Sequence, residues 1–276
     1  MQIDLRCRGV MAIINVTPDS FYADSRAADA CAVESAVRMA VAGGASIIDI
    51  GGYSSRPGAV DVPAEEEFRR VAEGLRTVRM VAPKAAVSVD TFRAEVAARC
   101  LEAFGPLIVN DITAGEADPE LMRVAARHDV PYVAMHMRGT PSTMQSMTDY
   151  EDVVTEVAEY LRERIARLTE AGVRRENIVV DPGFGFAKSV EQNFQLLAGL
   201  HRLRELDCPI LAGVSRKSMI YKTLDISPEE ALNGTSALHW ECLRQGATLL
   251  RVHDVREAVQ CVRLYEKFAN YYDTSR

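Results

Sequence analysis

Arg251 and His253, which can both carry positive charge, follow a short apolar run with one residue between them. Successive side chains of a strand point to opposite sides, so this spacing directs both groups to the same side. Together they suit an anion such as a phosphate or pyrophosphate. The flat guanidinium of Arg251 could instead stack on a ring. A salt bridge to a neighbouring carboxylate is the alternative explanation for Arg251.

A glycine-rich segment, Asp181-Pro182-Gly183-Phe184-Gly185-Phe186, follows another apolar run. Its glycines permit a backbone path and a close ligand approach that bulkier residues resist. Its phenylalanines, Phe186 among them, could pack against a planar ring. Asp181 could accept two parallel hydrogen bonds from an amidine-like edge, as carboxylates do from guanidinium. A strand-to-helix turn capped by the aspartate is an equally good explanation of this segment alone.

The segment Ser215-Arg216-Lys217-Ser218 is basic and also follows an apolar run. Lys217 offers a point charge to a carbonyl oxygen or a ring nitrogen. Ser218, with the exposed amides of a helix start, would suit a carboxylate or a phosphate. A helix cap flanked by solvated basic residues would have the same sequence, so this segment alone leaves both interpretations open.

Asn15 opens a polar segment, Asn15-Val16-Thr17-Pro18-Asp19-Ser20-Phe21, that is poor in helix formers. Asn15 and Asp19 offer oxygen ligands for Mg²⁺, which keeps several waters and is usually bound together with substrate phosphates. The same residues fit an Asx turn in which Asp19 caps the next helix. The spacing therefore permits a magnesium site without requiring one.

Further polar residues stand at the ends of the middle apolar runs. Asp90 and Asn110 end neighbouring runs, so both could reach one polar heterocycle. Asp111 and Thr113 fit structural roles better. His136 stands between two methionines that could form an adaptable wall against a flat ligand, and a single histidine here fits a positioning role better than that of a base.

Eight apolar runs carry these residues, and amphipathic helical stretches separate most of them. Buried parallel strands have continuous Val/Ile/Leu runs and need long, usually helical crossovers. The pattern predicts a single α/β domain over residues 1–276, a (β/α)8 TIM barrel with its site at the carboxyl ends of the strands, and a frayed tail beyond about residue 270. The predicted strands are Met11–Val16, Ile47–Ile50, Ala86–Val89, Leu107–Val109, Tyr132–Met135, Ile178–Val180, Ile210–Val214 and Leu249–Leu250.

Composition narrows the class of protein. The formal net charge of −7 argues against a general nucleic-acid surface, and no stretch approaches the roughly 20 apolar residues of a membrane span. The 6 cysteines are scattered without a C-x-x-C pair, which is typical of reduced thiols in a cytosolic protein. The N-terminal segment lacks the pattern of a secretory signal, so we expect a cytoplasmic location.

Taken together, these segments resemble the dihydropteroate synthases of the pterin-binding family. The matching segments occur in the same order as in the family, from about Val10 to Val259. Any one of them would be a weak match, but eight in the same order make a specific one. The matching segments are Asn15–Phe21, Asp49–Ala59, Val87–Thr91, Val109–Thr113, Met135–Gln145, Asp181–Asn193, Ser215–Ile220 and Arg251–Val255.

The resemblance implies a (β/α)8 fold and a transferase of folate biosynthesis. In the implied reaction, 4-aminobenzoate displaces pyrophosphate from 6-hydroxymethyl-7,8-dihydropterin pyrophosphate and gives 7,8-dihydropteroate. The bond to pyrophosphate would break early, in an SN1-like step that leaves a delocalised pterin cation. An aryl amine is already a free base at neutral pH, so no strong general base is needed. The resemblance also implies that the enzyme uses Mg²⁺ as a cofactor, forms a homodimer and is a target of sulfonamide drugs.

The resemblance also assigns roles to individual residues. The polar edges of the pterin would be held by Asp90, Asn110, Asp181 and Lys217, and its faces by Arg251, Met135 and Phe186. The pyrophosphate, with Mg²⁺ on Asn15, would be held by Asn15, Arg251, His253 and the hydroxyl of Ser55. The aminobenzoate site would comprise Phe21, Arg56, Pro57, Lys217 and Ser218. The residues expected to carry the reaction are Asn15, Asp90, Lys217, Arg251 and His253.

Three positions depart from the family pattern. Tyr53 stands where the family usually has Glu, Ser55 where it has Thr, and Ala187 where Gly is common. Three other functions remain open: a methyltransferase module that binds methyltetrahydrofolate, a non-catalytic pterin-binding paralogue, and a barrel for another phosphorylated substrate. The Arg56–Pro57 and Ser215–Ser218 segments favour the synthase, because a methyltransferase module handles no aminobenzoate.

Overall fold

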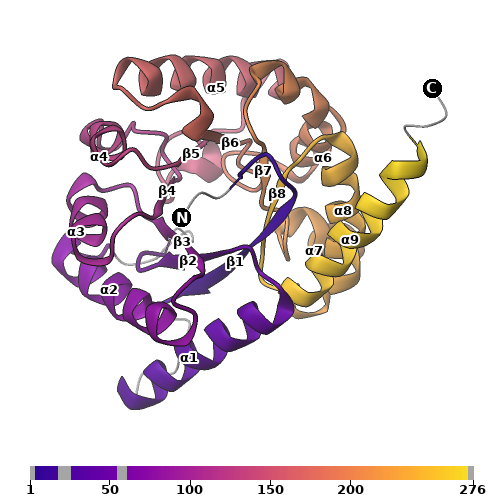
Figure 1. The fold of residues 1–276 in the computed structure, drawn as a ribbon. Coiled ribbons are helices and arrows are strands. Elements are labelled where there is room, and N and C mark those ends of the chain that lie inside the picture. Colours follow the sequence, from indigo (N-terminus) through magenta and orange to yellow (C-terminus); the bar gives the residue numbers. More distant parts are fainter. Residues whose placement is uncertain (1–3, 18–25, 55–60, 273–276) are drawn as a thin grey trace.

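The computed structural model describes residues 4–17, 26–54 and 61–272, with the side chains of all but 26–30 and 272. Over this part of the chain, parallel strands form an 8-stranded sheet in the order β6-β5-β4-β3-β2-β1-β8-β7. A bridge between Val180 and Ile210 joins β6 to the segment before β7, so the sheet curls into a barrel with the helices outside it (Figure 1). The predicted (β/α)8 fold is confirmed.

The strands and helices alternate along the chain. The strands are β1 (Gly9–Asn15), β2 (Ile47–Gly51), β3 (Ala86–Asp90), β4 (Ile108–Asp111), β5 (Tyr132–Met135), β6 (Ile178–Asp181), β7 (Leu211–Ala212) and β8 (Leu249–Val252). The helices are α1 (Arg26–Gly43), α2 (Ala64–Val81), α3 (Ala94–Phe104), α4 (Glu120–His128), α5 (Val153–Glu170), α6 (Val190–Ala198), α7 (Ser218–Leu224), α8 (Leu232–Gln245) and α9 (Val255–Tyr272). Short 3-10 turns are η2 (Met144–Ser146), η3 (Arg175–Asn177), η4 (Leu200–Leu206) and η5 (Pro228–Glu230).

Each predicted strand is present, with small shifts at the ends. The strand that is most shortened is β7, where only Leu211 and Ala212 join the ladder. Ile210 makes an isolated bridge, and Val214 instead accepts a turn hydrogen bond from the Lys217 amide at 3.2 Å. The strand ends early because the chain already turns into the basic segment.

Helix ends follow ordinary capping chemistry. The side chain of Asp152 accepts hydrogen bonds from the amides of Val154 and Thr155 and so begins α5. Gly246 has a φ of 111° at the end of α8, a conformation that suits glycine. These two caps fix where α5 begins and where α8 ends.

The barrel interior changes from apolar to polar along its axis. Met11, Ile47 and Leu249 belong to a buried cluster that fills the inside of the barrel near the amino ends of its strands. Because side chains alternate along a strand, the next inward positions are two residues later, at Asp49 on β2 and Arg251 on β8. The same alternation takes Ile108 to Asn110, Val133 to Met135 and Val179 to Asp181. Asp49, Asn110, Asp181 and Arg251 therefore form a polar layer next to the apolar cluster, toward the carboxyl ends of the strands.

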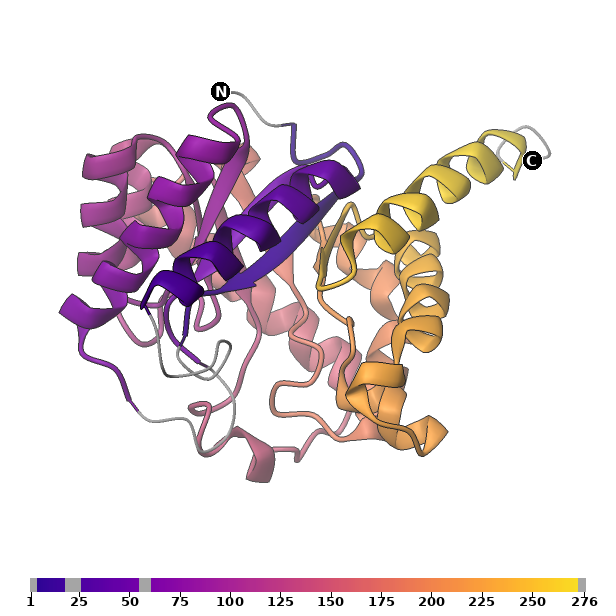
Figure 2. The ribbon, with the colours of Figure 1, turned by 90° about the horizontal axis from the view of Figure 1, so that it is seen from below.

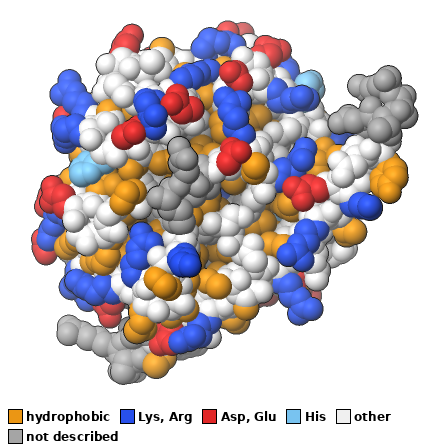
Figure 3. Space-filling view, viewed as in Figure 1, with side chains coloured by type: hydrophobic (Ala, Val, Ile, Leu, Met, Phe, Trp, Pro, Cys, Tyr) orange, Lys and Arg blue, Asp and Glu red, His pale blue; other side chains and the backbone are white. Residues whose placement is uncertain are grey.

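Strand register brings these residues side by side. Asp90 on β3 pairs with Asn110 on β4, and Met135 on β5 pairs with Asp181 on β6. In Figure 2, η2 and α7 lie at the end of the barrel opposite the N-terminus. Figure 3 views the face that carries the N-terminus, where Lys, Arg, Asp and Glu side chains are interspersed over the helices. The polar layer opens toward the other end.

No helix in the described ranges is long and apolar enough to cross a membrane. All of the cysteines are free thiols, and Cys100, Cys208, Cys242 and Cys261 are buried. The tail expected beyond about residue 270 is still helical at Tyr272, and residues 273–276 lie outside the described part.

Candidate active site

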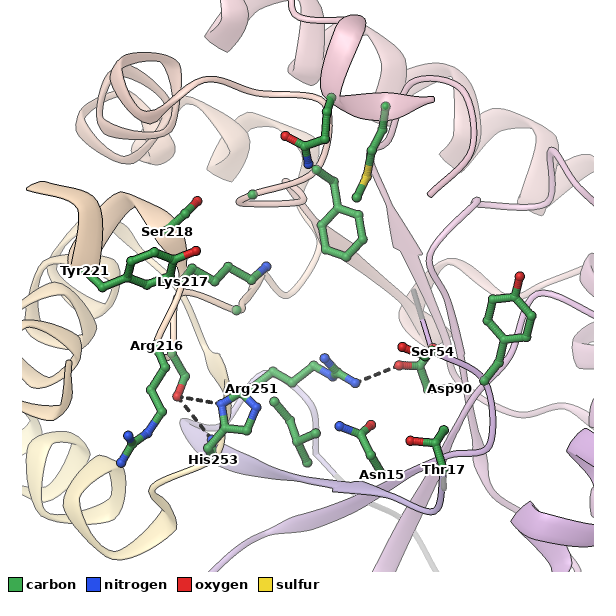
Figure 4. Close-up of a pocket in the computed structure, with 18 of the residues that line it drawn as sticks. Asn15, Thr17, Ser54, Asp90, Arg216, Lys217, Ser218, Tyr221, Arg251 and His253 are labelled. Carbon is green, nitrogen blue, oxygen red and sulfur yellow. Dashed lines mark hydrogen bonds and ion pairs between the residues drawn. The ribbon is translucent and has the colours of Figure 1, made fainter. Parts of the chain in front are cut away.

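A pocket of 490 Å³ opens at the carboxyl ends of the strands (Figure 4). Arg251 reaches across it toward Asp90, Lys217 extends into it from the side of α7, and Arg216 points away. The predicted site residues that line the pocket are Asn15, Asp90, Phe186, Lys217, Ser218, Arg251 and His253. The other described ones, Asn110, Met135 and Asp181, are buried, with exposed fractions of 3%, 4% and 6%.

Arg251 is held by two carboxylates. Its Nε donates to Asp49 Oδ2 at 2.8 Å, and its Nη2 lies 2.7 Å from Asp90 Oδ2. Asn110 Nδ2 also donates to Asp49 Oδ2, at 3.2 Å. The ion pairs that the sequence left as an alternative are therefore present. They fix the guanidinium as a flat surface that still lines the pocket.

The charge of Asp90 is finely balanced. Burial raises the pKa of Asp90 to about 7, Arg251 opposes the rise, and Asp49 and Glu67 add to it. Desolvation penalises a buried carboxylate unless a donor compensates it. A ligand that presents N–H groups to Asp90 would therefore stabilise its charged form.

Lys217 and Asp181 form a second polar pair. The ammonium of Lys217 donates to the carbonyl of Phe184 and lies 4.8 Å from the ring centroid of Phe186. Burial lowers the pKa of Lys217 to about 8, against the opposing charge of Asp181. Burial raises the pKa of Asp181, and Lys217 opposes that rise.

The glycine-rich segment after β6 is shaped by close backbone packing. One oxygen of Asp181 accepts the amide hydrogen of Gly183 at 2.8 Å, which is the turn cap that the sequence allowed. Gly183 has a φ of 68°, and a Cβ there would lie 2.0 Å from the carbonyl oxygen of His136. Glycine is therefore required at this position by a neighbouring backbone.

Lys188 anchors this segment through hydrogen bonds to its backbone. Its Nζ lies 2.9 Å from each of three acceptors: His136 Nδ1 and the carbonyl oxygens of Gly183 and Phe186. Burial, with the charge of Lys188 second, lowers the pKa of His136 to about 2. His136 is therefore neutral at pH 7.

The end of β8 is organised around Ser215. Ser215 Oγ lies 3.1 Å from His253 Nδ1 and accepts the backbone amide hydrogen of His253 at 3.2 Å. His253 is exposed as a residue, and desolvation, with the charge of Arg251 second, lowers the pKa of its imidazole below the usual value. The imidazole is therefore neutral at pH 7. Arg216 also lines the pocket, but its guanidinium points away from it (Figure 4) and makes a bidentate pair with Asp254 at 2.7 and 2.8 Å.

The residues expected to hold a metal are few. Asn15 is at the carboxyl end of β1 and lines the pocket. Within residues 4–17, 26–54 and 61–272, no three His, Cys, Asp or Glu side chains are grouped as a metal site.

Several predicted residues lie outside the described part of the chain: Asp19, Phe21, Ser55, Arg56 and Pro57. Other pocket or supporting residues had no role assigned to them from the sequence. Asp49, Lys188 and Ser215 hold predicted residues in place, and Thr17, Ser54, Gln145 and Tyr221 line the pocket. Strand alternation could have identified Asp49, which is two residues after an inward apolar residue.

Two departures from the family pattern have visible consequences. Tyr53 packs edge-on against Phe92, with 5.1 Å between ring centroids, and the guanidinium of Arg93 lies 5.4 Å from the centroid of the Tyr53 ring. Ala187 is fully buried at a φ of 50°, where a Cβ is unfavourable. This backbone explains why glycine suits position 187.

Comparison with known proteins gives a consistent result. Residues 11–253 match the model of the family described as pterin binding enzyme. The chain is 41% identical over 266 residues to the dihydropteroate synthase of Escherichia coli strain K12, covering 96% of this chain and 93% of that protein. It is 42% identical over 259 residues to that of Synechocystis, covering 92% and 88%.

Solved structures give the same picture. Xanthomonas albilineans dihydropteroate synthase with 4-aminobenzoic acid matches with a TM-score of 0.85 and 42% identity, over 96% of this chain and 94% of that one. The same enzyme in complex with 7,8-dihydropteroate gives 0.84 and 39%, over 97% and 95%. A sulfonamide drug complex of the Yersinia pestis enzyme gives 0.87 and 35%, over 98% and 97%.

Proposed function

The chain belongs to the dihydropteroate synthases of the pterin binding enzyme family, and on that premise we propose which groups it joins and how. It transfers the pterin methylene of 6-hydroxymethyl-7,8-dihydropterin pyrophosphate to the amino group of 4-aminobenzoate. The products are 7,8-dihydropteroate, a folate precursor, and pyrophosphate. The observation that carries this proposal is one pocket lined by Asp90, Lys217, Arg251 and His253, with groups for both a heterocycle and an anion.

The pterin lies in the polar layer of the barrel. Asp90, Asn110 and Asp181 face its polar edges, and Lys217 meets its carbonyl oxygen or a ring nitrogen. The guanidinium of Arg251, fixed by its two ion pairs, covers one face. Phe186 and Met135 belong to one apolar cluster and cover the other.

The reaction proceeds by early departure of pyrophosphate. The bond between the methylene carbon and the pyrophosphate oxygen breaks, and its electron pair leaves with that oxygen. The carboxylates of Asp90 and Asp181 stabilise the resulting pterin cation electrostatically. The amino nitrogen of 4-aminobenzoate then attacks the methylene carbon and afterwards releases a proton. Arg251 and His253 stabilise the departing anion.

Mg²⁺ fits this site as an ion that enters with pyrophosphate. Asn15 contributes one amide oxygen, and Mg²⁺ commonly combines few protein ligands with water and substrate phosphates. The donor set around Asn15 is compatible with that mode. When bound, the ion would neutralise charge on the leaving group.

The aminobenzoate site adjoins Lys217 and Ser218 at the start of α7, where both line the pocket. Phe21, Arg56 and Pro57 complete it in the proposal. Sulfonamides would compete with 4-aminobenzoate here, and the sulfonamide complex of the Yersinia pestis relative supports this. Free thiols at all six cysteines support a reducing, cytoplasmic environment.

The test is pyrophosphate release from the dihydropterin pyrophosphate with Mg²⁺, with and without 4-aminobenzoate, followed by chromatography of the products. We expect dihydropteroate to form only with 4-aminobenzoate. Pterin binding without that product would favour a non-catalytic paralogue. Methyl transfer from methyltetrahydrofolate to a corrinoid would favour the methyltransferase module, and phosphate binding without pterin binding would favour another substrate.

Lys217 predicts a basic limb in the pH profile. Its pKa of about 8 means that the ammonium loses its proton as pH rises through about 8, and with it the charge that meets the pterin. The kcat/KM for the pterin substrate reports the free enzyme, so we expect it to fall above pH 8. Lys217→Arg keeps its charge and should remove this limb. An unchanged limb in that variant would exclude Lys217 as its source.

The proposed homodimer has a candidate surface on α9. Leu264, Phe268 and Tyr271 are exposed by 65%, 49% and 67%, and their spacing places them on one side of the helix. This end of α9 projects from the barrel (Figures 1 and 2). Contact between two copies would cover these apolar side chains.

We expect Phe268→Glu to shift the protein toward the monomer in light scattering coupled to size exclusion, because a buried charge opposes association. Asn270→Glu adds the same charge on the opposite side of α9 and should leave the mass unchanged. A dimer that resists Phe268→Glu would place the interface elsewhere.

A further inference from the structure

Ser215 has a hydroxyl that touches two nitrogens of one residue. Its Oγ accepts the backbone amide hydrogen of His253 at 3.2 Å and lies 3.1 Å from His253 Nδ1 (dashed lines at His253 in Figure 4). Ser215 is buried, with 4% of its surface exposed. These are the hydrogen-bond contacts of its hydroxyl within the described ranges.

The direction of the bond to Nδ1 follows from satisfying every polar group. The backbone amide can only donate, so it occupies a lone pair of Oγ. The hydroxyl hydrogen then needs an acceptor, because an unpaired buried donor is unfavourable. Nδ1 of a neutral imidazole can be that acceptor, provided that its own proton is on Nε2. The arrangement that leaves no hydroxyl hydrogen unpaired is therefore Ser215 Oγ–H donating to His253 Nδ1.

This direction matters because His253 is neutral at pH 7, its pKa being held below the usual value by desolvation and by Arg251. An imidazolium would offer N–H groups at both nitrogens, whereas a neutral ring offers only one. Nδ1 faces Ser215, and the ring lines the pocket. Only the Nε2–H form places a donor on the side away from Ser215.

We propose that Ser215 is a positioning residue that holds His253 as the Nε2–H tautomer, so that a neutral imidazole donates a hydrogen bond to the pyrophosphate group. This rests on the proposed function for the identity of the anion, but the tautomer itself does not. Ser215, which also lines the pocket, acts in this proposal through His253.

The tautomer is measured first, on the ligand-free protein, by ¹⁵N NMR of histidine-labelled enzyme at pH 7, with His253→Gln identifying the signals. We expect Nδ1 to have the shift of an unprotonated nitrogen and Nε2 that of a protonated one. Ser215→Thr keeps the hydroxyl and should keep this pattern. Ser215→Ala should give a mixture of tautomers, while the signals of the buried His239 stay unchanged as a check on the fold.

Binding of inorganic pyrophosphate with Mg²⁺ is measured next, by calorimetry. We expect Ser215→Ala to weaken it about 10-fold, Ser215→Thr to restore it, and free hydroxymethylpterin to bind all three proteins alike. An Nδ1–H signal in the unmodified protein would overturn the proposal, as would unchanged pyrophosphate affinity in a Ser215→Ala protein with mixed tautomers. If no protein binds pyrophosphate while the tautomer is as expected, the proposed function fails and the tautomer assignment stands.

Discussion

Asp181→Asn is expected to weaken binding of hydroxymethylpterin about 10- to 100-fold and to change 4-aminobenzoate binding by less than about 3-fold. Asp181 is 6% exposed, at the end of β6 and within electrostatic range of Lys217. A hydrogen bond to a charged group contributes about 1.5–3 kcal/mol, and each 1.4 kcal/mol is a factor of ten in affinity. An asparagine keeps the shape but offers one acceptor and no charge.

Calorimetry with each ligand separately measures this difference. Asp254→Asn is the matched control, because Asp254 is also at the barrel mouth but pairs with Arg216 and is not among the residues that line the pocket. We expect it to leave pterin binding unchanged. Equal losses for both ligands in Asp181→Asn would mean that the variant distorts the turn at Gly183, whose amide Asp181 accepts, and that Asp181 is not a selective pterin ligand.

The sequence predicts the barrel well because each strand is a continuous apolar run with a helical stripe after it. It also predicts which residues reach the pocket, since strand ends meet at one mouth in a parallel barrel. Asp90, Lys217 and Arg251 do line one pocket. What a single sequence lacks is the partner of each side chain, because those partners are far apart along the chain.

Arg251 illustrates this limit. From its spacing alone, an anion, a ring and a salt bridge were all compatible with the residue, and only the fold brings Asp49 and Asp90 within hydrogen-bond distance of it. Lys188 was missed for a similar reason. Its acceptors include backbone carbonyls. Every residue has a carbonyl, so residue type does not predict which carbonyl will accept a hydrogen bond.

The second large effect is expected at Arg251, because removing its charge leaves the buried carboxylate of Asp49 uncompensated and destabilises the folded state. Asp49 is fully buried, its Oδ1 has no hydrogen-bond partner in the described part of the chain, and its Oδ2 depends on Arg251 and Asn110. Arg251→Gln leaves that carboxylate without its counter-charge. Breaking a buried pair in this way destabilises a protein by about 3–5 kcal/mol.

We therefore expect Arg251→Gln to lower the free energy of unfolding in urea by about that amount, and Asp49→Asn combined with it to recover a large part of the loss. Such recovery is the coupling that a double-mutant cycle measures for residues in contact. Arg38→Gln, which breaks an exposed pair with Glu34 on α1, is the control and should cost about 1 kcal/mol or less. Additive losses in the Arg251→Gln and Asp49→Asn double variant would mean that Asp49 does not need the guanidinium. The stability gained would not restore turnover, because the double variant still lacks the flat cation that we propose covers the pterin. Stability and catalysis should separate at this residue, which serves both.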